Sequence, residues 1–284
     1  MPPRDNPSAR QVCLGTELRK LRERAGKTAR EAAGLLAIDQ AKISHIEAGR
    51  VGVGEERIRR LATFYSCHDE ALIEALCAIS REHRGKGWWD EYRGVLPPSF
   101  LDVAELEHHA AYIRYLQPVT VPGVFQTEGY ARAMFGSVIP RLPVAEVENR
   151  VEHRLRRRAI FEREVPPQVE VVIHEAALRM RVGGRDVARE QLAHLLEACT
   201  WLHVTLRVIP FVNDDFVDVT QTVLYAGGVV PQLDTVQLDT PWGGLYLDAG
   251  AELDRYQALL DFAHQVALGP TESQQVIHNI AREL

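Results

Sequence analysis

Residues 28–50, TAREAAGLLAIDQAKISHIEAGR, constrain the fold more than any other segment, because they encode two short helices joined by a tight turn. Thr28 and Glu31 have the spacing of a capping box, which opens the first helix. Asp39 is a good N-cap for the second helix, and Gly49 ends it. The side chains expected to pack between the two helices and set their angle are Ala33, Ile38, Ile43 and Ile46.

Three more helices are expected around this pair. A polar, proline-containing start predicts that the first ten residues lie outside the fold, and Gly26 ends the first helix as a left-handed cap. The pattern therefore predicts a five-helix domain over residues 10–84. The apolar positions that repeat at helical spacing are Leu14, Leu18, Leu21 and Ala25, then Ile58, Leu61, Phe64 and Tyr65, then Leu72, Ile73, Leu76 and Ile79.

The outward flank of the second helix of the pair is polar. Gln40, Lys42, Ser44 and His45 fall on or beside that face. A helix-turn-helix protein presents such side chains, near the start of this helix, to base edges in the major groove. Gln and Lys bond base edges directly, whereas Ser and His do so less selectively. The flank therefore predicts that the domain reads double-stranded DNA.

The charge is distributed unevenly along the chain. The net charge of −6 argues weakly against nucleic acid. Residues 1–65, however, hold 13 Lys and Arg against eight Asp and Glu, whereas the rest holds 20 against 31. Because a local basic face decides attraction to phosphate, the N-terminal domain remains the expected DNA-binding part.

The same segment resembles the Xre/Cro/repressor family of helix-turn-helix proteins. The family pattern reads approximately T-x-x-E-x-A, then Q-x-x-I-S-x-I-E-x-G. Its positions are matched here by Thr28, Glu31, Ala33, Gln40, Ile43, Ser44, Ile46, Glu47 and Gly49. The resemblance implies that Gln40 and Ala41 open the recognition helix against the bases, followed by Lys42, Ser44 and His45. It also implies a structural pair between Glu47 and Arg22.

The resemblance further suggests which residues contact phosphate. Many relatives carry a phosphate-contacting Gln where this chain has Ala29. Arg30 is the expected replacement, and Thr28 and Arg50 are the other expected phosphate contacts. Three alternatives stay open: a helix-turn-helix used only for dimerisation, a surface role for His45, and an exposed helix face formed by Arg57, Arg59 and Arg60 with their neighbouring glutamates.

A different kind of sequence follows residues 85–99, whose glycines and prolines predict a domain junction. Beyond it, a mixed α/β domain is expected over residues 100–284, as part of an α + α/β chain. Strands are predicted at 169–175, 203–211, 220–227, 234–240 and 243–248. Helices are predicted near 127–135, 143–162, 185–200, 251–267 and 271–283.

This second part resembles the large C-terminal domain of actinomycete regulators of the WhiJ type. The resemblance is carried by residues 106–135, with the core VPGVFQTEGYARA, by VTLRVIPF at 204–211, and by residues 269–283. It implies control by a small partner protein encoded nearby, of an acidic or BldB-like type, and control by a small ligand sensed by this domain is an alternative. An antitoxin-like role, neutralising that partner, is the related alternative.

Two features of this part have alternative interpretations. Trp88, Trp89 and Tyr92 are expected to fill the interface between the domains, with a partner-binding patch as the alternative. The basic run of Arg154, Arg156, Arg157 and Arg158 lies on a helix with glutamates and is expected to be a solvent-exposed face. The alternative for this run is a site for an acidic partner or additional DNA.

No catalytic motif is present, so we expect a binding protein and not an enzyme. His108 and His109 are adjacent and point apart on a helix, which disfavours a metal site, and no cofactor motif occurs. An enzyme tethered to DNA, with an active site that no motif reveals, is the alternative.

The start of the chain has no apolar signal segment, no stretch is long enough to cross a membrane, and the four cysteines are widely spaced. These features predict a cytoplasmic, nucleoid-associated protein with reduced thiols.

Specific recognition by so small a domain normally needs two half-sites, because one domain buries limited area. We therefore expect a homodimer on an inverted repeat.

Overall fold

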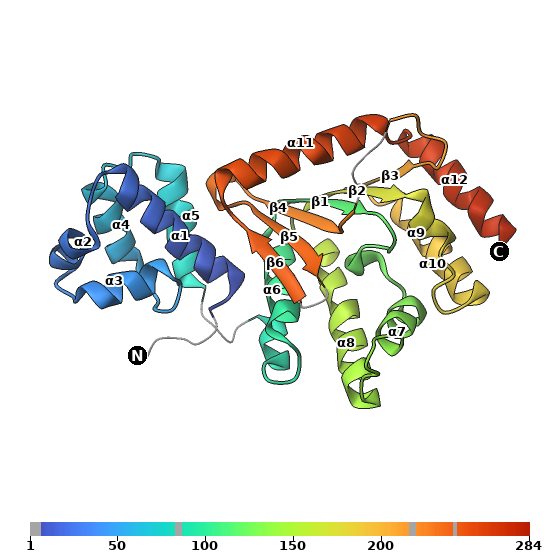
Figure 1. Cartoon of the computed structure of the whole chain (residues 1–284), viewed down its shortest axis with the longest axis horizontal. Helices are drawn as coiled ribbons and strands as arrows, with labels where there is room; N and C mark the ends of the chain where they lie inside the picture. The colour runs from blue at the N-terminus through green and yellow to red at the C-terminus, as the bar shows by residue number, and fades with distance from the viewer. Residues whose placement is uncertain (1–6, 83–86, 216–219, 241–242) are drawn as a thin grey trace.

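A computed structural model describes residues 7–82, 87–215, 220–240 and 243–284. It shows a helical N-terminal domain beside a larger domain built on a mixed sheet (Figure 1). The expected fold class is therefore confirmed. The predicted N-terminal arm falls largely on residues 1–6, and residues 85 and 86 of the predicted junction also lie outside the described residues.

The N-terminal domain contains the five predicted helices. Their bounds are α1 Ala9–Arg24, α2 Ala29–Leu36, α3 Gln40–Glu47, α4 Glu55–Phe64 and α5 Glu70–Arg81. The first helix begins earlier than the apolar spacing indicated, because Ser8 and Gln11 form a capping box at its start. Gly26 adopts a φ of 65° directly after the α1 cap, as expected for a left-handed residue that ends a helix.

One apolar core joins the five helices. Leu18, Ile43, Ile46 and Ile58 are each at most 2% exposed within it. Val230, from the C-terminal domain, belongs to the same cluster and is 5% exposed. The two domains therefore share part of one apolar core.

The junction between the domains is folded. A 3-10 helix, η1 (Trp88–Tyr92), is followed by α6 (Pro98–His109). Trp89 and Tyr92 are buried against Leu101 and Ala104 of α6. These aromatic rings therefore pack mainly on the larger domain. Trp89 also lines a cavity between the domains, whereas Trp88 and Tyr92 do not, so the expected interface position is met in part.

The larger domain has a six-stranded sheet in the order β3-β2-β1-β4-β5-β6. Strands β1, β2 and β3 are parallel, and β4, β5 and β6 continue the sheet with antiparallel pairings. The strands are β1 Tyr112–Gln117, β2 Gln168–His174, β3 Val204–Ile209, β4 Val223–Gly227, β5 Thr235–Thr240 and β6 Gly243–Leu247. Five of them were predicted, and the sequence interpretation missed β1.

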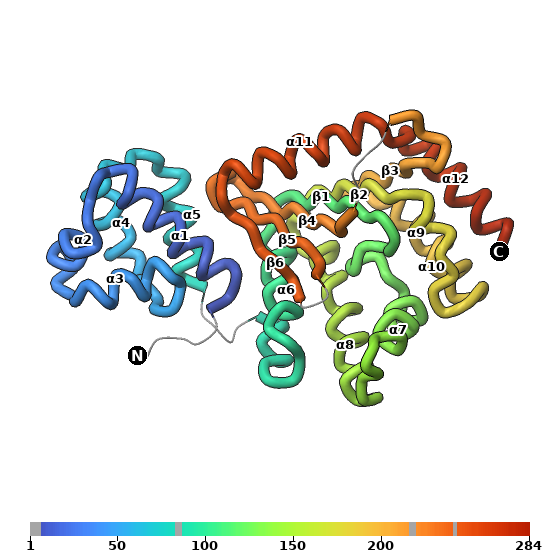
Figure 2. Tube along the Cα trace, viewed as in Figure 1, coloured from blue at the N-terminus to red at the C-terminus, as the bar shows by residue number. Residues whose placement is uncertain are grey.

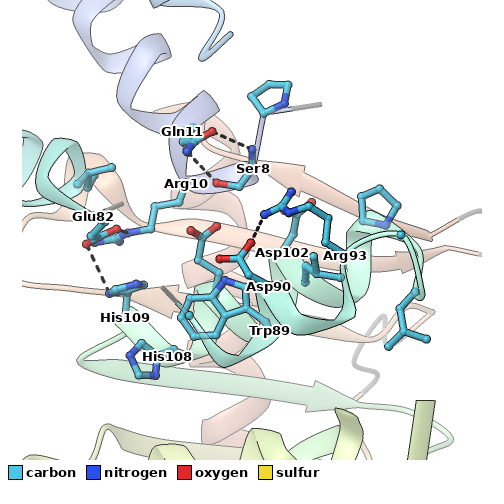
Figure 3. A pocket seen from close by; sticks show the side chains of 18 of the residues that line it. Ser8, Arg10, Gln11, Glu82, Trp89, Asp90, Arg93, Asp102, His108 and His109 are labelled. Carbon is cyan, nitrogen blue, oxygen red and sulfur yellow. Dashed lines mark hydrogen bonds and ion pairs between the residues drawn. The ribbon is translucent and has the colours of Figure 1, made fainter. Parts of the chain in front are cut away.

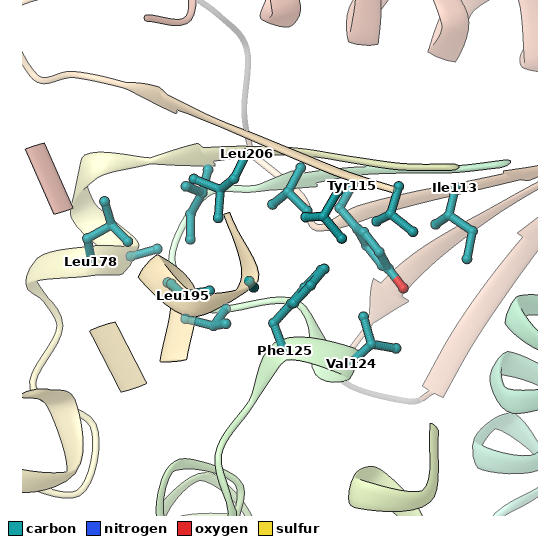
Figure 4. Close-up of a cluster of buried hydrophobic side chains, with 14 of the residues drawn as sticks. Ile113, Tyr115, Val124, Phe125, Leu178, Leu195 and Leu206 are labelled. Carbon is teal, nitrogen blue, oxygen red and sulfur yellow. The ribbon is translucent and has the colours of Figure 1, made fainter. Parts of the chain in front are cut away.

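Helices cover both faces of this sheet (Figure 1). On one face, Tyr115, Phe125, Leu195 and Leu206 meet in the main core, which is shown in Figure 4. On the other face, α11 packs over Leu116 and Tyr225. The remaining helices are η2 Gly123–Phe125, α7 Glu128–Gly136, α8 Val144–Arg156, η3 Arg157–Glu162, α9 Glu175–Arg179, α10 Arg185–Ala198, η4 Pro231–Leu233, α11 Gly250–Val266 and α12 Pro270–Glu283.

The connection between β4 and β5 reaches into the N-terminal domain. The Sγ atom of Cys13 lies 3.8 Å from the main-chain oxygen of Leu233, and Gln232 donates to Asp69 at 3.2 Å. Lys20 of α1 donates to the main-chain oxygen of Asp248 at 2.9 Å. Helices α2 and α3 lie at the far end of the molecule from the sheet, as the trace in Figure 2 shows. Docking therefore uses α1 and the start of α5 and leaves the α2–α3 pair uncovered.

Candidate nucleic-acid interface

Helix α3 is held from behind and at both ends. Asp39 accepts a hydrogen bond of 2.7 Å from the main-chain N–H of Lys42, which caps the start of the helix. Ile43 and Ile46 are each 1% exposed and anchor its inner face. Gly49, with a φ of 69°, ends the helix against the main chain of α1. Packing of the inner face and of both ends therefore sets the orientation of α3. The side chains of its outer flank take no part in that packing.

That outer flank carries all five residues predicted to contact bases. Gln40, Ala41 and Ser44 are exposed, and Lys42 and His45 are partly exposed. The Ser44 hydroxyl donates to the main-chain oxygen of Gln40 at 3.3 Å, so its proton is already engaged within the helix. The amide of Gln40 and the ammonium of Lys42 are thus the stronger candidates for bonds to base edges.

The residues predicted to contact phosphate are also exposed. Arg30 and Arg50 lie at the surface near the two ends of the helix pair. Neither of them, nor Lys42, forms an ion pair with a carboxylate in the described part of the chain. The Thr28 hydroxyl donates to Glu31 at 2.7 Å and accepts from its N–H at 3.2 Å, so this side chain is committed to the capping box. Arg30 and Arg50 therefore supply the uncompensated charge.

Arg22 and Glu47 form the pair that the resemblance implied. The Arg22 Nε and Nη2 atoms donate to the two Glu47 carboxylate oxygens at 2.6 and 2.9 Å. Nη1 donates to the main-chain oxygen of Lys27 at 2.9 Å. The hydrogen bonds to Glu47 raise the pKa of the Arg22 guanidinium. This pair locks α1 to the end of α3, and each of the three guanidinium nitrogens of Arg22 already donates a hydrogen bond within the domain.

The arginines of α4 are engaged within the protein. Arg59 forms ion pairs with Glu55 at 2.8 Å and with Glu74 at 2.6 Å. Arg60 donates to the main-chain oxygen of Leu35 at 2.6 Å, which ties α4 to the end of α2. These contacts support a structural role for this face.

Two family models match the chain. One, described as a domain of unknown function (DUF5753), matches residues 100–279. The chain belongs to the DUF5753 family. A second model, described as a helix-turn-helix domain, matches residues 14–76 and covers all of the α2–α3 pair of this DUF5753 protein. No curated protein and no solved structure matched the chain.

The basic run at the end of α8 and the start of η3 differs from expectation. Arg157 is 6% exposed and is bonded to the fully buried Glu107, while Arg154 donates to Gln126 at 2.6 Å. Only Arg156 forms an ion pair at the surface, with Glu91. The prediction of a solvent-exposed face was therefore wrong for Arg157, and Arg154 is only partly exposed. The reason is that their partners come from α6 and η2, which are distant in sequence.

A signal for the arginines that gather on one side of this helix was present in the sequence. Arg150, Arg154 and Arg157 are spaced four and three residues apart, which places them on one side of a continuous helix. The interpretation grouped Arg154 with Arg156, Arg157 and Arg158 as one basic run and did not consider this spacing. All three residues line one cavity in the structure.

A second cavity, of about 510 Å³, lies where the domains meet (Figure 3). Arg10 donates to both carboxylate oxygens of Glu82 at 2.7 Å, and the same carboxylate lies 3.5 Å from the His109 ring. Burial, and then the nearby Arg10, lower the pKa of His109 to about 4. Trp89 packs beside the rings of His108 and His109. These aromatic and charged groups connect α1, α5 and α6.

Among the described residues, no group of three or more His, Cys, Asp or Glu side chains is placed to hold a metal ion. No described helix has the length and apolar character needed to cross a membrane.

Proposed function

We propose that this chain is a sequence-specific transcription regulator whose helix α3 reads the major groove of double-stranded DNA. The observation that carries the proposal is the division of α3 into two sides. Its isoleucines are 1% exposed, while Gln40, Ala41 and Ser44 face solvent, and the helix belongs to the domain that lies beside the sheet domain (Figure 1). Groups buried in this way fix the helix without using the side chains that would contact bases.

Arg30, Lys42 and Arg50 support the proposal because they are cations without ion-pair partners in the described part of the chain. Phosphate contacts by such residues supply much of the affinity for DNA and make it depend on salt. The affinity should fall with rising salt by a logarithmic slope of about 0.9 for each phosphate contact.

The proposed active form is a homodimer bound to an inverted repeat. Helices α2 and α3 of one copy bury limited area, and a second copy doubles the contacts. The C-terminal domain would control binding, since Val230 and Lys20 connect it to the N-terminal domain. In this proposal the protein acts in the cytoplasm at the nucleoid, by binding and not by catalysis. A small partner protein is one source of that control, and a small ligand is the other.

Selection of bound duplexes from a random pool tests the proposal. We expect one enriched sequence with two related half-sites, and a complex whose mass corresponds to two chains per duplex. Binding without any sequence preference, at equal affinity for every duplex, contradicts specific recognition. Selective binding by a single chain to one half-site contradicts only the proposed homodimer.

A further inference from the structure

A cavity of about 420 Å³ lies under the sheet of the C-terminal domain, at the carboxyl end of β1. Phe100, Met134 and Leu224 give it apolar walls, and Gln117 and Gln237 add amide groups. Its volume is within the range of sites for small organic ligands. In sheets with parallel strands, ligands commonly bind outside the carboxyl ends of those strands.

Three arginines of α8 and η3 line one wall of this cavity, and two of them have carboxylate partners. Arg150 pairs with Glu146 at 2.6 Å, and its guanidinium lies 5.0 Å from the centre of the Phe100 ring. Arg157 donates from Nε to Glu107 at 2.7 Å, and Tyr115 donates to the same carboxylate at 2.6 Å. The charge of Arg157 is therefore balanced from outside the cavity.

Arg154 is different, because it has no carboxylate within ion-pair distance among the described residues. Its Nη1 donates to the neutral amide of Gln126 at 2.6 Å, and its buried Nε makes no hydrogen bond there. Burial, and then the neighbouring Arg157, lower its pKa to about 9. Asp239 is the acidic residue of the lining, and it accepts a hydrogen bond from Gln237 at 2.6 Å. The negative charge of Asp239 acts on Arg154 from across the cavity, but no described carboxylate contacts the Arg154 guanidinium directly.

We propose that this cavity binds a small organic anion, with its carboxylate or phosphate group held by Arg154 and its body packed between Phe100, Met134 and Leu224. A planar guanidinium binds such a group through paired, charge-assisted hydrogen bonds. The anion would supply the direct ion-pair partner that no described carboxylate gives to Arg154. Transfer of an apolar body from water to these apolar walls is favourable.

The position of the cavity connects it to the N-terminal domain. Ser99 and Phe100, at the start of α6, line the cavity, and α6 also packs against α1. An anion at Arg154 would therefore contact the same helix that supports the DNA-binding domain. This effect on DNA binding rests on the proposed function and specifies the ligand that would control it. Binding of the anion to the cavity does not depend on the proposed function.

Calorimetry and thermal unfolding of the full chain, at constant ionic strength, test the proposal. The probes are phenyl phosphate and benzoate, with inorganic phosphate and benzylamine for comparison. We expect phenyl phosphate and benzoate to bind in the millimolar range or tighter and to raise the unfolding temperature. Inorganic phosphate should bind more weakly, because it lacks the apolar body, and benzylamine should not bind. Equal binding of benzylamine, or no binding of either aromatic anion, overturns the proposal.

Arg154→Met provides the decisive variant, and Arg141→Met, at an exposed position of the same domain, is its matched control. Arg154→Met should weaken aromatic anion binding by about tenfold or more, because it removes charge-assisted hydrogen bonds. Without ligand it should unfold at a similar temperature, since the variant loses the hydrogen bond to Gln126 and the contact with the Phe135 ring but also loses a partly buried charge that has no carboxylate partner. Arg154→Lys should bind with intermediate affinity, and Arg141→Met should behave as the unchanged protein. Undiminished anion binding by a folded Arg154→Met chain rejects the site.

A DNA measurement separates this proposal from the proposed function. With the selected duplex, phenyl phosphate should change the affinity of the unchanged chain for DNA but not that of Arg154→Met. If the chain binds no specific DNA while calorimetry still detects anion binding that depends on Arg154, the regulator proposal fails and the ligand site stands.

Discussion

Tyr225 donates a hydrogen bond of 2.9 Å to the fully buried carboxylate of Asp234, and this bond closes the base of the connection between β4 and β5. Tyr112 donates to the same carboxylate at 2.6 Å, and the N–H of Gly228 donates to it at 3.0 Å. The connection held in this way carries Val230 into the core of the N-terminal domain. A polar anchor in one domain thus positions an apolar contact in the other.

Val230→Asp should weaken the contact between the domains. Val230 is 5% exposed, whereas its neighbour Val229 is 88% exposed. Burial of a valine side chain contributes about 1.5–3 kcal/mol to stability. The Asp variant loses this contribution, and burial of its carboxylate adds a desolvation cost. Urea unfolding should show lower stability, and amide exchange in α1 should become faster. Val229→Asp is the control. If both variants have the same stability and the same amide exchange in α1, burial of Val230 does not hold the domains together.

Gln40→Ala combined with Lys42→Ala should remove sequence selectivity while the fold stays intact. Each good contact to a base edge is worth about 1–3 kcal/mol of discrimination, and neither side chain is part of the apolar core. Footprints and thermal unfolding measure the two effects. Gln274→Ala with Arg282→Ala, at exposed positions of α12, makes the same change in charge far from α3. Unchanged footprints from the α3 double variant remove the assignment of these two residues.

Gly15→Ala should destabilise the N-terminal domain. A Cβ atom at Gly15 would lie 2.6 Å from the main-chain oxygens of Ile46 and Glu47, so α1 and the end of α3 would have to separate. Overpacking of this kind costs about 1–3 kcal/mol. Gly34→Ala in α2 is the matched control, because nothing lies within 4 Å of its Cβ position. That variant should gain about 0.5–1 kcal/mol from helix propensity. Chemical denaturation measures both, and equal effects contradict the close approach.

His153 should make stability depend on pH. Its ring is fully buried against Trp88, Tyr92 and Phe100, neither ring nitrogen has a described partner, and burial lowers its pKa to about 3. Because the folded pKa lies below the unfolded value, the unfolded chain binds a proton first as the pH falls. Stability should therefore decrease by about 1.4 kcal/mol per pH unit between roughly pH 6.5 and 3.

His153→Phe should flatten this part of the profile, since it removes the titrating group and keeps an aromatic ring. His278→Phe, on an exposed face of α12, serves as the control and should leave the slope as it was. The measurement is the free energy of unfolding in urea across this pH range. If the slope persists in His153→Phe, other groups are responsible for it.

Local patterns were enough to predict the helix-turn-helix pair. Thr28 with Glu31 and Asp39 with the N–H of Lys42 form caps within four residues, and Ile43 and Ile46 repeat at helical spacing. Because each of these signals acts over one or two turns, neighbouring residues contain all the information needed. The polar flank of α3 follows from the same periodicity.

Strand β1 could not be predicted in the same way. Arg114 lies in the middle of it, which argues against a buried central strand. In the structure Arg114 pairs with Glu170 of β2 at 2.7 Å and with Asp261 of α11 at 2.7 Å. Only folding brings these carboxylates to the arginine, because they lie far from it in the chain.

The sequence by itself determined the N-terminal helices, their caps, the exposed flank of α3 and most strands of the second domain, since these depend on short-range periodicity and turn chemistry. The tertiary structure alone decided that Val230 docks one domain onto the other and that Arg154 faces a cavity without a carboxylate partner. Burial and charge pairing depend on which distant side chains fold against a residue, and no local pattern encodes that arrangement.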